Sequence, residues 1–259
     1  MKNTATRLAA IAGLVALCFA SPVLGQTTVS ITGAPSTGSF GDGIADPYDG
    51  TVVYDGVTLA NNGLIVCDDY KDNVVVPETW NATALQASQL PTLTTAQLNA
   101  DTFFGDTVGL NGYAAEASLV AQVLATPDSN PTKQADLSAA IWYITDSGVG
   151  GIAWSSLDPQ AQAYVTAAEA PFGGSTALTP DSTSASAIAA LEVDTNLWIF
   201  TPNPTTGYTQ NAGDGEPQEM WVSTPEGGAA LLYLLLSGAS CFGAMFFNAR
   251  DRLGNRAAA

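Results

Sequence analysis

An uncharged run near the carboxyl terminus is long enough to cross a membrane, unlike the charged chain on either side of it. The run from Ala229 to Phe247 has 19 positions without a charge. As a helix it extends about 28 Å, close to the roughly 30 Å apolar core of a bilayer. Arg250, Arg252 and Arg256 follow the run, and basic residues beside a membrane span tend to stay on the cytoplasmic side. The sequence therefore predicts one transmembrane helix over 229–247, with its arginine-rich end inside.

The amino terminus has the three-part layout of a secretory signal peptide. Lys2 and Arg7 precede an apolar stretch from Leu8 to Ala20, and small or modest residues stand three and one positions before the expected cleavage point. The apolar stretch is too short to span a membrane. We therefore expect residues 1–25 to direct export and to be removed. With the arginines held inside, the body of the chain is expected on the extracytoplasmic side.

The expected exported domain, residues 26–223, is strongly acidic. The chain has 24 acidic and seven basic residues, and this part keeps 22 of the acidic residues but only Lys71 and Lys133 of the basic ones. Nucleic acid and anionic lipid surfaces are repelled by such a charge. We therefore expect no nucleic-acid partner, while cationic partners remain compatible with the charge.

Cysteine and histidine usage removes most common hydrolase chemistry. Cys18 falls in the signal segment and Cys241 in the uncharged run, which leaves Cys67 alone in the exported part. A disulfide within that part is therefore excluded. The chain has no histidine, so a Ser-His-Asp triad, a Cys-His pair and a His-ligated zinc site are excluded as well. We expect no catalytic residues, no cofactor and no enzymatic activity.

Hydrophobic patterning predicts an α+β body in which strands flank a central helical block. Two strands are expected over "TVVYDGVTL" and "NGLIVCDDY", with a turn at "ANNG". Helices are expected over "YAAEASLVAQVLATP", over "KQADLSAAIWYITDSG", and from Pro159, behind Asp158, to about Glu169. A loop rich in Ser, Thr and Gly comes next. The strands "LEVDTNLWIFTP" and "EMWVST" then complete the body.

The residues around the uncharged run resemble a known sorting signal. Pro225, Glu226 and Gly227 precede the run, and the arginine cluster follows it. This order, over residues 224–259, is similar to the PEP-CTERM signal of bacterial envelope proteins, with Gly227 where the family usually has a second proline. The resemblance implies recognition by exosortase, a membrane transpeptidase that removes the tail. It implies a membrane-held, non-enzymatic envelope protein that is sorted to the surface or to an exopolysaccharide matrix.

A second resemblance covers the middle of the body, roughly residues 60–146. Cys67 after an apolar strand, a helix of the type "AAEASLVAQVLATP" and the segment "LSAAIW" are similar to the thioester domains of bacterial surface adhesins. In that family the Cys is joined to a Gln in a "TQ-x-A-I-W" segment, and the acyl bond can capture an amine. The resemblance implies a thioester-type surface adhesin as the alternative function, and an aromatic patch would make the alternative a carbohydrate-binding adhesin instead.

The match to the thioester motif is incomplete. Ala140, Ile141 and Trp142 agree with its end, but Ser138 stands at the Gln position. A serine hydroxyl cannot donate an acyl group, so no thioester can form there. Gln134 lies one helical turn earlier and would need a different geometry. Cys67 is then either a small apolar core residue or a reactive thiol.

Three other sets of residues allow a functional and a structural interpretation. Asp42, Asp46 and Asp49 offer oxygen ligands for calcium, but Asp, Gly and Pro are also what tight turns require. An acidic set after the second strand either forms a solvated face or supplies a carboxylate pair for sugar hydrolysis. The tryptophans either fill the core or stack on sugars, and Trp154 is expected to be exposed. The acidic set consists of Asp68, Asp69, Asp72 and Glu78.

Overall fold

The computed structural model describes most of the body of the chain. The described residues are 27–33, 39–40, 43–44, 47–70, 76–127, 129–146, 151–175, 178–179, 182–194, 196–202 and 218–224. The predicted signal peptide, the sorting motif, the span over 229–247 and the arginine cluster lie outside them. No helix among the described residues is both long enough and apolar enough to cross a membrane.

Six strands close into an antiparallel barrel in the order β1-β4-β5-β8-β7-β6. β5 and β6 precede the helices and β7 and β8 follow them, so strands from both ends of the body pair within one sheet. A separate two-stranded sheet is formed by β2 (Ser39–Phe40) and β3 (Gly43–Ile44). The barrel strands are β1 (Thr27–Gly33), β4 (Tyr48–Tyr54), β5 (Val57–Cys67), β6 (Glu78–Gln86), β7 (Leu197–Pro202) and β8 (Met220–Ser223).

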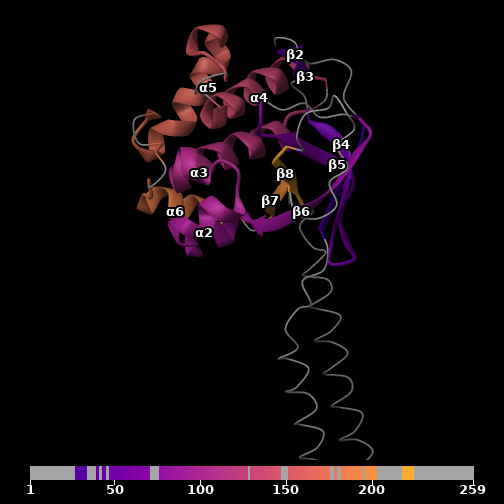
Figure 1. Ribbon diagram of the computed structural model, residues 1–259. Coiled ribbons are helices and arrows are strands. Elements are labelled where there is room, and N and C mark those ends of the chain that lie inside the picture. The colour runs from indigo at the N-terminus through magenta and orange to yellow at the C-terminus, as the bar shows by residue number, and fades with distance from the viewer. Residues whose placement is uncertain are drawn as a thin grey trace, which may run out of the picture.

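The helices pack together on one side of the barrel (Figure 1). The longest is α3, which packs against α2, α4, α5 and α6. The α+β class predicted from the sequence is confirmed, and the strands do precede and follow a helical block. The helical elements are η1 (Ala87–Thr92), α2 (Thr95–Asp101), α3 (Gly105–Leu124), α4 (Pro131–Asp146), η2 (Trp154–Ser156), α5 (Pro159–Glu169), η3 (Ala170–Phe172) and α6 (Ala185–Glu192).

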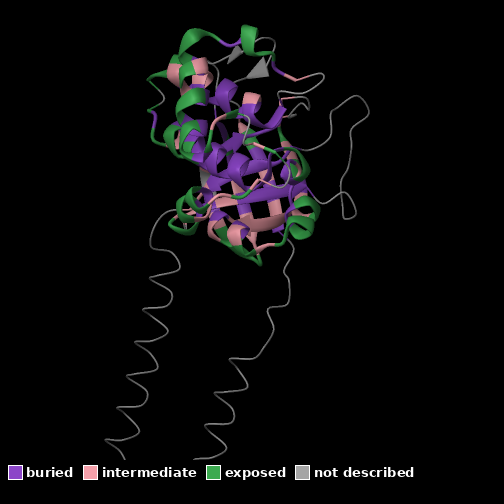
Figure 2. Ribbon diagram, turned by 90° about the vertical axis from the view of Figure 1, so that its left-hand side faces the viewer, coloured by how far each residue is buried: buried purple, intermediate pink, exposed green. Residues whose placement is uncertain are grey.

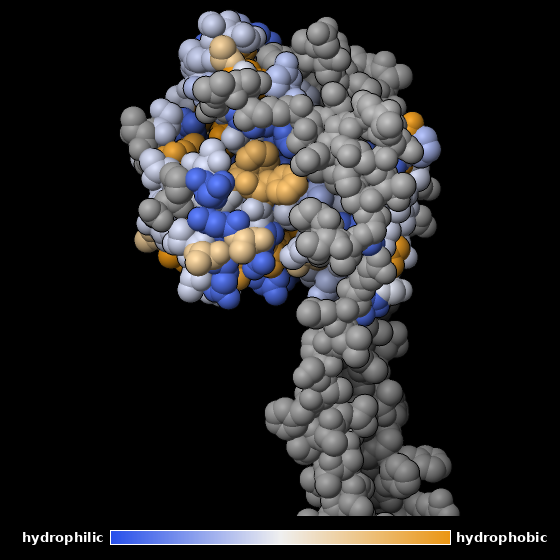
Figure 3. All heavy atoms as spheres, viewed as in Figure 1, coloured by the Kyte–Doolittle hydropathy of each residue, from blue (hydrophilic) through white to orange (hydrophobic). Residues whose placement is uncertain are grey.

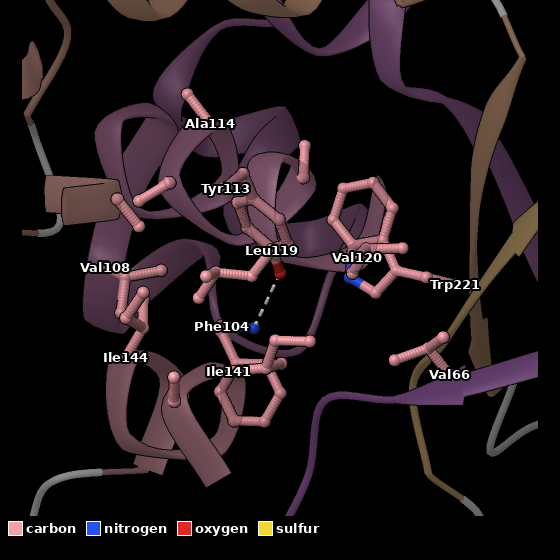
Figure 4. Close-up of a cluster of buried hydrophobic side chains, with 14 of the residues drawn as sticks. Val66, Phe104, Val108, Tyr113, Ala114, Leu119, Val120, Ile141, Ile144 and Trp221 are labelled. Carbon is pink, nitrogen blue, oxygen red and sulfur yellow. Dashed lines mark hydrogen bonds between the residues drawn. The ribbon is translucent and has the colours of Figure 1, made fainter. Parts of the chain in front are cut away.

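Two hydrophobic clusters form the core. One fills the barrel with side chains from all six strands, and the other lies between the barrel wall and the helices. Side chains alternate along β5, so Ile65 and Cys67 join the barrel cluster while Val66 joins the helix cluster. Figure 2 shows that the buried residues run from the helices into the sheet. Figure 4 shows part of the second cluster, to which Trp221 from β8 and Val120 from α3 both belong.

The three helices expected in the middle of the chain are confirmed as α3, α4 and α5. The predicted first helix began at Tyr113, whereas α3 begins at Gly105 and contains a kink at Gly109, where φ is 61°. The Asp158 side chain caps α5 as expected, accepting hydrogen bonds from the backbone N–H groups of Gln160 and Ala161 at 2.8 Å each. Local periodicity and capping residues were therefore sufficient to locate these helices.

The hairpin between β4 and β5 turns at a different place from the one expected. Its turn is Asp55–Gly56, with φ of 51° and 74°, the positive values that a two-residue hairpin favours. The predicted turn at "ANNG" is wrong, because β5 runs through those residues. Gly50 pairs with Gly63 and Val52 pairs with Ala60, so β5 holds one extra residue at this point. The asparagines therefore belong to a β-bulge.

The loop expected after α5 contains a helix that the sequence analysis missed. Ser184 caps α6 by accepting a hydrogen bond from the Ala187 N–H at 3.1 Å, and Ala187 and Leu191 are buried. The strand expected to start at Leu191 begins instead at Leu197. Eight residues give only two helical turns of pattern, and packing against α3 and η1 stabilises a helix too short to be stable alone.

The barrel leaves no room for a side chain at Gly50. A Cβ atom there would lie 2.6 Å from the Ser30 carbonyl oxygen and would also collide with the Ile65 side chain. We expect Gly50→Ala to lower the free energy of unfolding by about 1–3 kcal/mol, measured by equilibrium urea denaturation. The neighbouring substitution Thr51→Ala, at a half-buried position, is the control and should cost clearly less. Equal stability of Gly50→Ala and the wild type would contradict this packing.

Candidate functional site

A thiol and a carboxamide meet where β5 ends and β8 begins. Cys67 pairs with Met220 across the β5–β8 ladder, and Gln218, two residues before Met220, returns to the same face of the extended chain. The Cys67 Sγ atom lies 2.5 Å from Gln218 Oε1. Hydrogen bonds between two oxygen atoms already span about 2.5–3.0 Å, so this separation is compressed for the larger sulfur atom. It is comparable to the separation of a sulfur and an oxygen bonded to the same carbonyl carbon.

The Cys67–Gln218 pair is closed off from solvent. Cys67 is 5% exposed and Gln218 is 2% exposed. The thiol also contacts the backbone of Asp69, whose N–H donates to Sγ at 3.4 Å and whose carbonyl oxygen lies 3.1 Å away. Burial raises the pKa of the Cys67 thiol well above its ordinary value, and the Asp69 carboxylate raises it further. An unmodified Cys67 would therefore stay protonated at neutral pH.

The end of α4 holds the segment that follows β5. The Trp142 Nε1–H donates to the Cys67 carbonyl oxygen at 3.0 Å, and the Thr145 hydroxyl donates to the Asp68 carbonyl oxygen at 2.5 Å. The Tyr70 N–H donates to the Asp146 carboxylate at 2.9 Å. Residues three and four apart share a helix face, so one face of α4 fixes the backbone beside the thiol.

The side chain that contacts the Cys67 thiol is not the one at the Gln position of the thioester motif. Ser138 is buried on α4, one turn before Trp142. Gln134 donates through its side-chain N–H to the Thr126 carbonyl oxygen at 3.2 Å. The side chain placed against the thiol is Gln218, which lies 151 positions away in sequence. The sequence analysis missed Gln218. Its only local signal was the position of a Gln directly before the strand "EMWVST".

A cluster of buried carboxyls lies on the opposite face of the same two strands. Asp68 follows Cys67, and Glu219 follows Gln218, so alternation directs both carboxyls toward α3. The Trp221 Nε1–H donates to Asp68 Oδ2 at 3.1 Å and also to Glu116 Oε1. We call Asp68, Glu116 and Glu219 the carboxyl cluster; all three are fully buried.

Asp68 and Glu116 share a single strong donor. Among the described residues, their other oxygens, Asp68 Oδ1 and Glu116 Oε2, receive no hydrogen bond from a neighbouring N–H or O–H group. A proton held by one of the two carboxyls can satisfy both. Burial raises the pKa of Asp68 well above its ordinary value, and the Glu116 charge raises it further. Burial likewise raises the pKa of Glu116.

Glu219 has a fuller set of donors. The Tyr113 hydroxyl donates to its Oε1 at 2.8 Å, the Phe103 N–H donates to its Oε2 at 2.9 Å, and the Thr201 hydroxyl donates to Oε2. The Tyr113 oxygen in turn accepts a hydrogen bond from the Phe104 N–H at 3.0 Å, the dashed line in Figure 4. Burial still raises the pKa of Glu219, against the effect of these donors.

The remaining acidic candidates do not converge on a metal. Asp49 lies on β4 with its side chain exposed, and Asp42 and Asp46 lie outside the described residues. In the part of the chain that the structure describes, no group of three acidic or cysteine side chains could hold a metal ion. Of the two interpretations of the acidic set, the solvated face is wrong for Asp68 and Asp69, because both are buried. Their burial follows from the strand end they occupy.

The tryptophans divide as the sequence analysis expected. Trp80, Trp142 and Trp221 are buried in the core, and Trp198 is half-buried. Trp154 is 42% exposed and is the one tryptophan among the described residues with an open side chain. It is therefore available to a ligand.

The fold and the site define an acidic barrel-and-helix protein with a buried Cys–Gln pair. No family model, no curated protein and no solved structure matches this chain.

The carboxyl cluster makes stability depend on pH in a defined direction. Carboxyls with a raised folded-state pKa hold more protons when folded, so the free energy of unfolding falls as pH rises above their ordinary values of about 4. Each proton involved contributes a slope of about 1.4 kcal/mol per pH unit. We expect Glu116→Gln to make the decline between pH 5 and pH 8 shallower than in the wild type, measured by urea denaturation at each pH.

The matched control for this prediction is Glu192→Gln, which makes the same chemical change at an exposed position at the end of α6. It should leave the slope of the wild type unchanged. A Glu116→Gln slope equal to that of the wild type would show that Glu116 is already ionised in the folded protein.

Proposed function

We propose that this chain is an exported cell-envelope protein whose body forms an internal thioester between Cys67 and Gln218. The thioester would attach the protein covalently to an amine-bearing partner. The observation that carries the proposal is the 2.5 Å separation between Cys67 Sγ and Gln218 Oε1. It favours the covalent adhesin over a purely structural envelope role. The protein would react once per molecule and is not proposed as an enzyme.

The bond can form without an external reagent. The Cys67 sulfur attacks the Cδ atom of Gln218, a carbon–sulfur bond forms, and the carbon–nitrogen bond of the carboxamide breaks. The nitrogen takes the thiol proton and leaves as ammonia. No oxidant or reductant is needed, because neither carbon nor sulfur changes oxidation state. The contacts of α4 with the backbone of Cys67 and Asp68 hold the thiol in place, and such positioning lowers the barrier to an intramolecular reaction.

The surroundings favour survival of the thioester until a partner arrives. Hydrolysis needs water at the carbonyl carbon, and Cys67 and Gln218 are nearly closed to solvent. A thiol with a high pKa is a poor leaving group, and burial gives Cys67 such a pKa. Both effects slow hydrolysis of the bond.

Capture of the partner reverses the roles of sulfur and nitrogen. A neutral amine attacks the thioester carbonyl, a carbon–nitrogen bond forms, and the carbon–sulfur bond breaks. The amine proton moves to the sulfur, which returns to the thiol form. The acidic body attracts lysine-rich surfaces through its charge. In Figure 3, the described part of the visible face is mostly hydrophilic, with separate hydrophobic patches.

The terminal segments support the envelope location in this proposal. The signal-like residues 1–25 would direct export, and the uncharged run 229–247 with its arginines would hold the tail in the membrane. Pro225 and Glu226 would mark the tail for an exosortase-type transpeptidase and transfer to the surface or to the polysaccharide matrix. These segments lie outside the described residues, so their support comes from the sequence alone.

Intact-mass spectrometry of the purified full-length protein tests the thioester. We expect the wild-type mass to be one ammonia lower than the mass calculated for the residues present, and Cys67→Ala and Gln218→Glu to show no such loss. Gln122→Glu, at an exposed position on α3, is the matched control and should still lose ammonia. A wild-type protein of full sequence mass with a titratable Cys67 thiol would refute the proposal.

A second measurement does not depend on how the variants fold. Incubating the wild-type protein with methylamine should open the thioester, add the mass of one methylamine and release a free thiol at Cys67. Peptide mapping should place the methylamide on Gln218. Methylamide at another glutamine, or no mass change, would contradict the assignment.

Cell fractionation tests the proposed sorting. We expect the wild-type protein to leave the inner membrane without its tail, and Glu226→Ala to remain there at full length. The control is Glu192→Gln, which should be sorted like the wild type. Persistence of tail-bearing wild-type protein in purified inner membrane would count against sorting and would leave the thioester test unaffected.

A further inference from the structure

An open pocket lies beside the end of α5, apart from the Cys67–Gln218 pair. Its volume is about 390 Å³, within the range of small-molecule sites. Its lining includes Tyr143 from α4, Trp154 from η2, and Thr166 and Glu169 from α5. Tyr143 directly follows Trp142, and neighbouring residues point in different directions from a helix. One residue therefore reaches the Cys67 backbone while the next lines this pocket.

The pocket presents an aromatic surface. Trp154 and Tyr143 meet at a centroid distance of 5.2 Å and an interplanar angle of 64°, which is an edge-to-face contact. The Gln162 side-chain N–H donates to the Trp154 carbonyl oxygen at 3.0 Å, which fixes the short helix that carries the indole. Trp154 nevertheless remains 42% exposed. A supported and partly open indole can stack on the apolar face of a ligand.

The pocket also contains a carboxyl that lacks a donor. Glu169 is 6% exposed, and no described residue gives its side chain a hydrogen bond or an ion pair. Burial raises the pKa of the Glu169 carboxyl; burial, and then the Glu169 charge, raise the pKa of Tyr143. The residue is buried as a whole, but its carboxyl oxygens are not sealed off from the pocket, so they remain free to accept hydrogen bonds. A ligand that supplies hydroxyl or N–H donors would satisfy Glu169.

The other polar groups of the pocket favour a ligand rich in hydroxyls. The Thr166 hydroxyl donates to the Gln162 carbonyl oxygen at 2.8 Å, so its free lone pairs are acceptors, and Ser175 adds a second hydroxyl at the edge. A sugar ring combines an apolar face with several donors. The net negative charge of the body disfavours an acidic sugar.

We propose that Tyr143, Trp154 and Glu169 form a binding site for a neutral sugar unit of a polysaccharide. The indole of Trp154 stacks on the ring, and the Glu169 carboxylate accepts hydrogen bonds from sugar hydroxyls. This sugar site is separate from the proposed thioester, because neither Cys67 nor Gln218 lines the pocket. It gives the protein a non-covalent contact with the matrix in addition to the covalent one.

Binding is tested on the full-length protein with methyl α-glucoside, methyl α-mannoside and methyl β-galactoside, using tryptophan fluorescence and saturation-transfer NMR. We expect saturable binding of at least one of these glycosides. Glu169→Gln should weaken that binding by about tenfold, since hydrogen bonds to a charged group are lost. Trp154→Ala should weaken it by about tenfold or more through loss of stacking, and Trp154→Phe should retain part of it.

The control is Glu192→Gln, which should bind like the wild type, and all variants should keep the wild-type circular dichroism spectrum. Three results would overturn the proposal: no binding of any neutral glycoside, binding unaffected by Trp154→Ala and Glu169→Gln, or preferential binding of tetramethylammonium, which would indicate a cation site. Ammonia loss is measured on the same samples. It should be unchanged in Trp154→Ala, so failure of the sugar site and failure of the thioester can be told apart.

Discussion

The antiparallel pairing of β5 with β8 is the contact on which the rest of the site depends. It joins strands on either side of the helical block and sets residue 67 beside residues 218 to 220. Because side chains alternate along a strand, the thiol–carboxamide pair and the carboxyls lie on opposite faces of these two strands. Cys67 and Gln218 lie on the barrel face, and the carboxyls of Asp68 and Glu219 lie on the helix face. A register shift of one residue would exchange the two sets.

Helix α4 links this ladder to the outside of the molecule. Its Trp142 and Thr145 hydrogen-bond to the backbone of Cys67 and Asp68, and its Tyr143 lines the pocket that contains Glu169. The segment "AAIWYITD" therefore has two roles. Its polar groups hydrogen-bond to the end of β5, and its Tyr143 ring lines the pocket. This gives a structural reason for the pattern that resembles the thioester motif, although Ser138 stands where that motif has its Gln.

Local patterns were sufficient for the helices and insufficient for the site. The 3.6-residue periodicity and the Asp158 cap located α3, α4 and α5, because these signals lie within one or two helical turns. The partner of Cys67 could not be found in this way, since Gln218 is 151 positions away and pairing across a barrel leaves no local mark. The turn at Asp55–Gly56 did carry a local signal, an Asp-Gly pair, which the asparagines of "ANNG" obscured. The charge of Asp68 and Asp69 suggested a position on the surface. Both are nevertheless buried, because they follow directly on the buried strand β5.

The place of Gln218, just ahead of the last described strand, determines how a mechanical load would travel. A partner captured on the Gln218 side chain would be tethered a few residues from Thr224, the end of the body at which the proposed sorting would attach the protein to the surface. Tension between the partner and the cell would then run along β8 alone and bypass the helices and the other five strands. Shear flow could unfold most of the body without lengthening or breaking that tether.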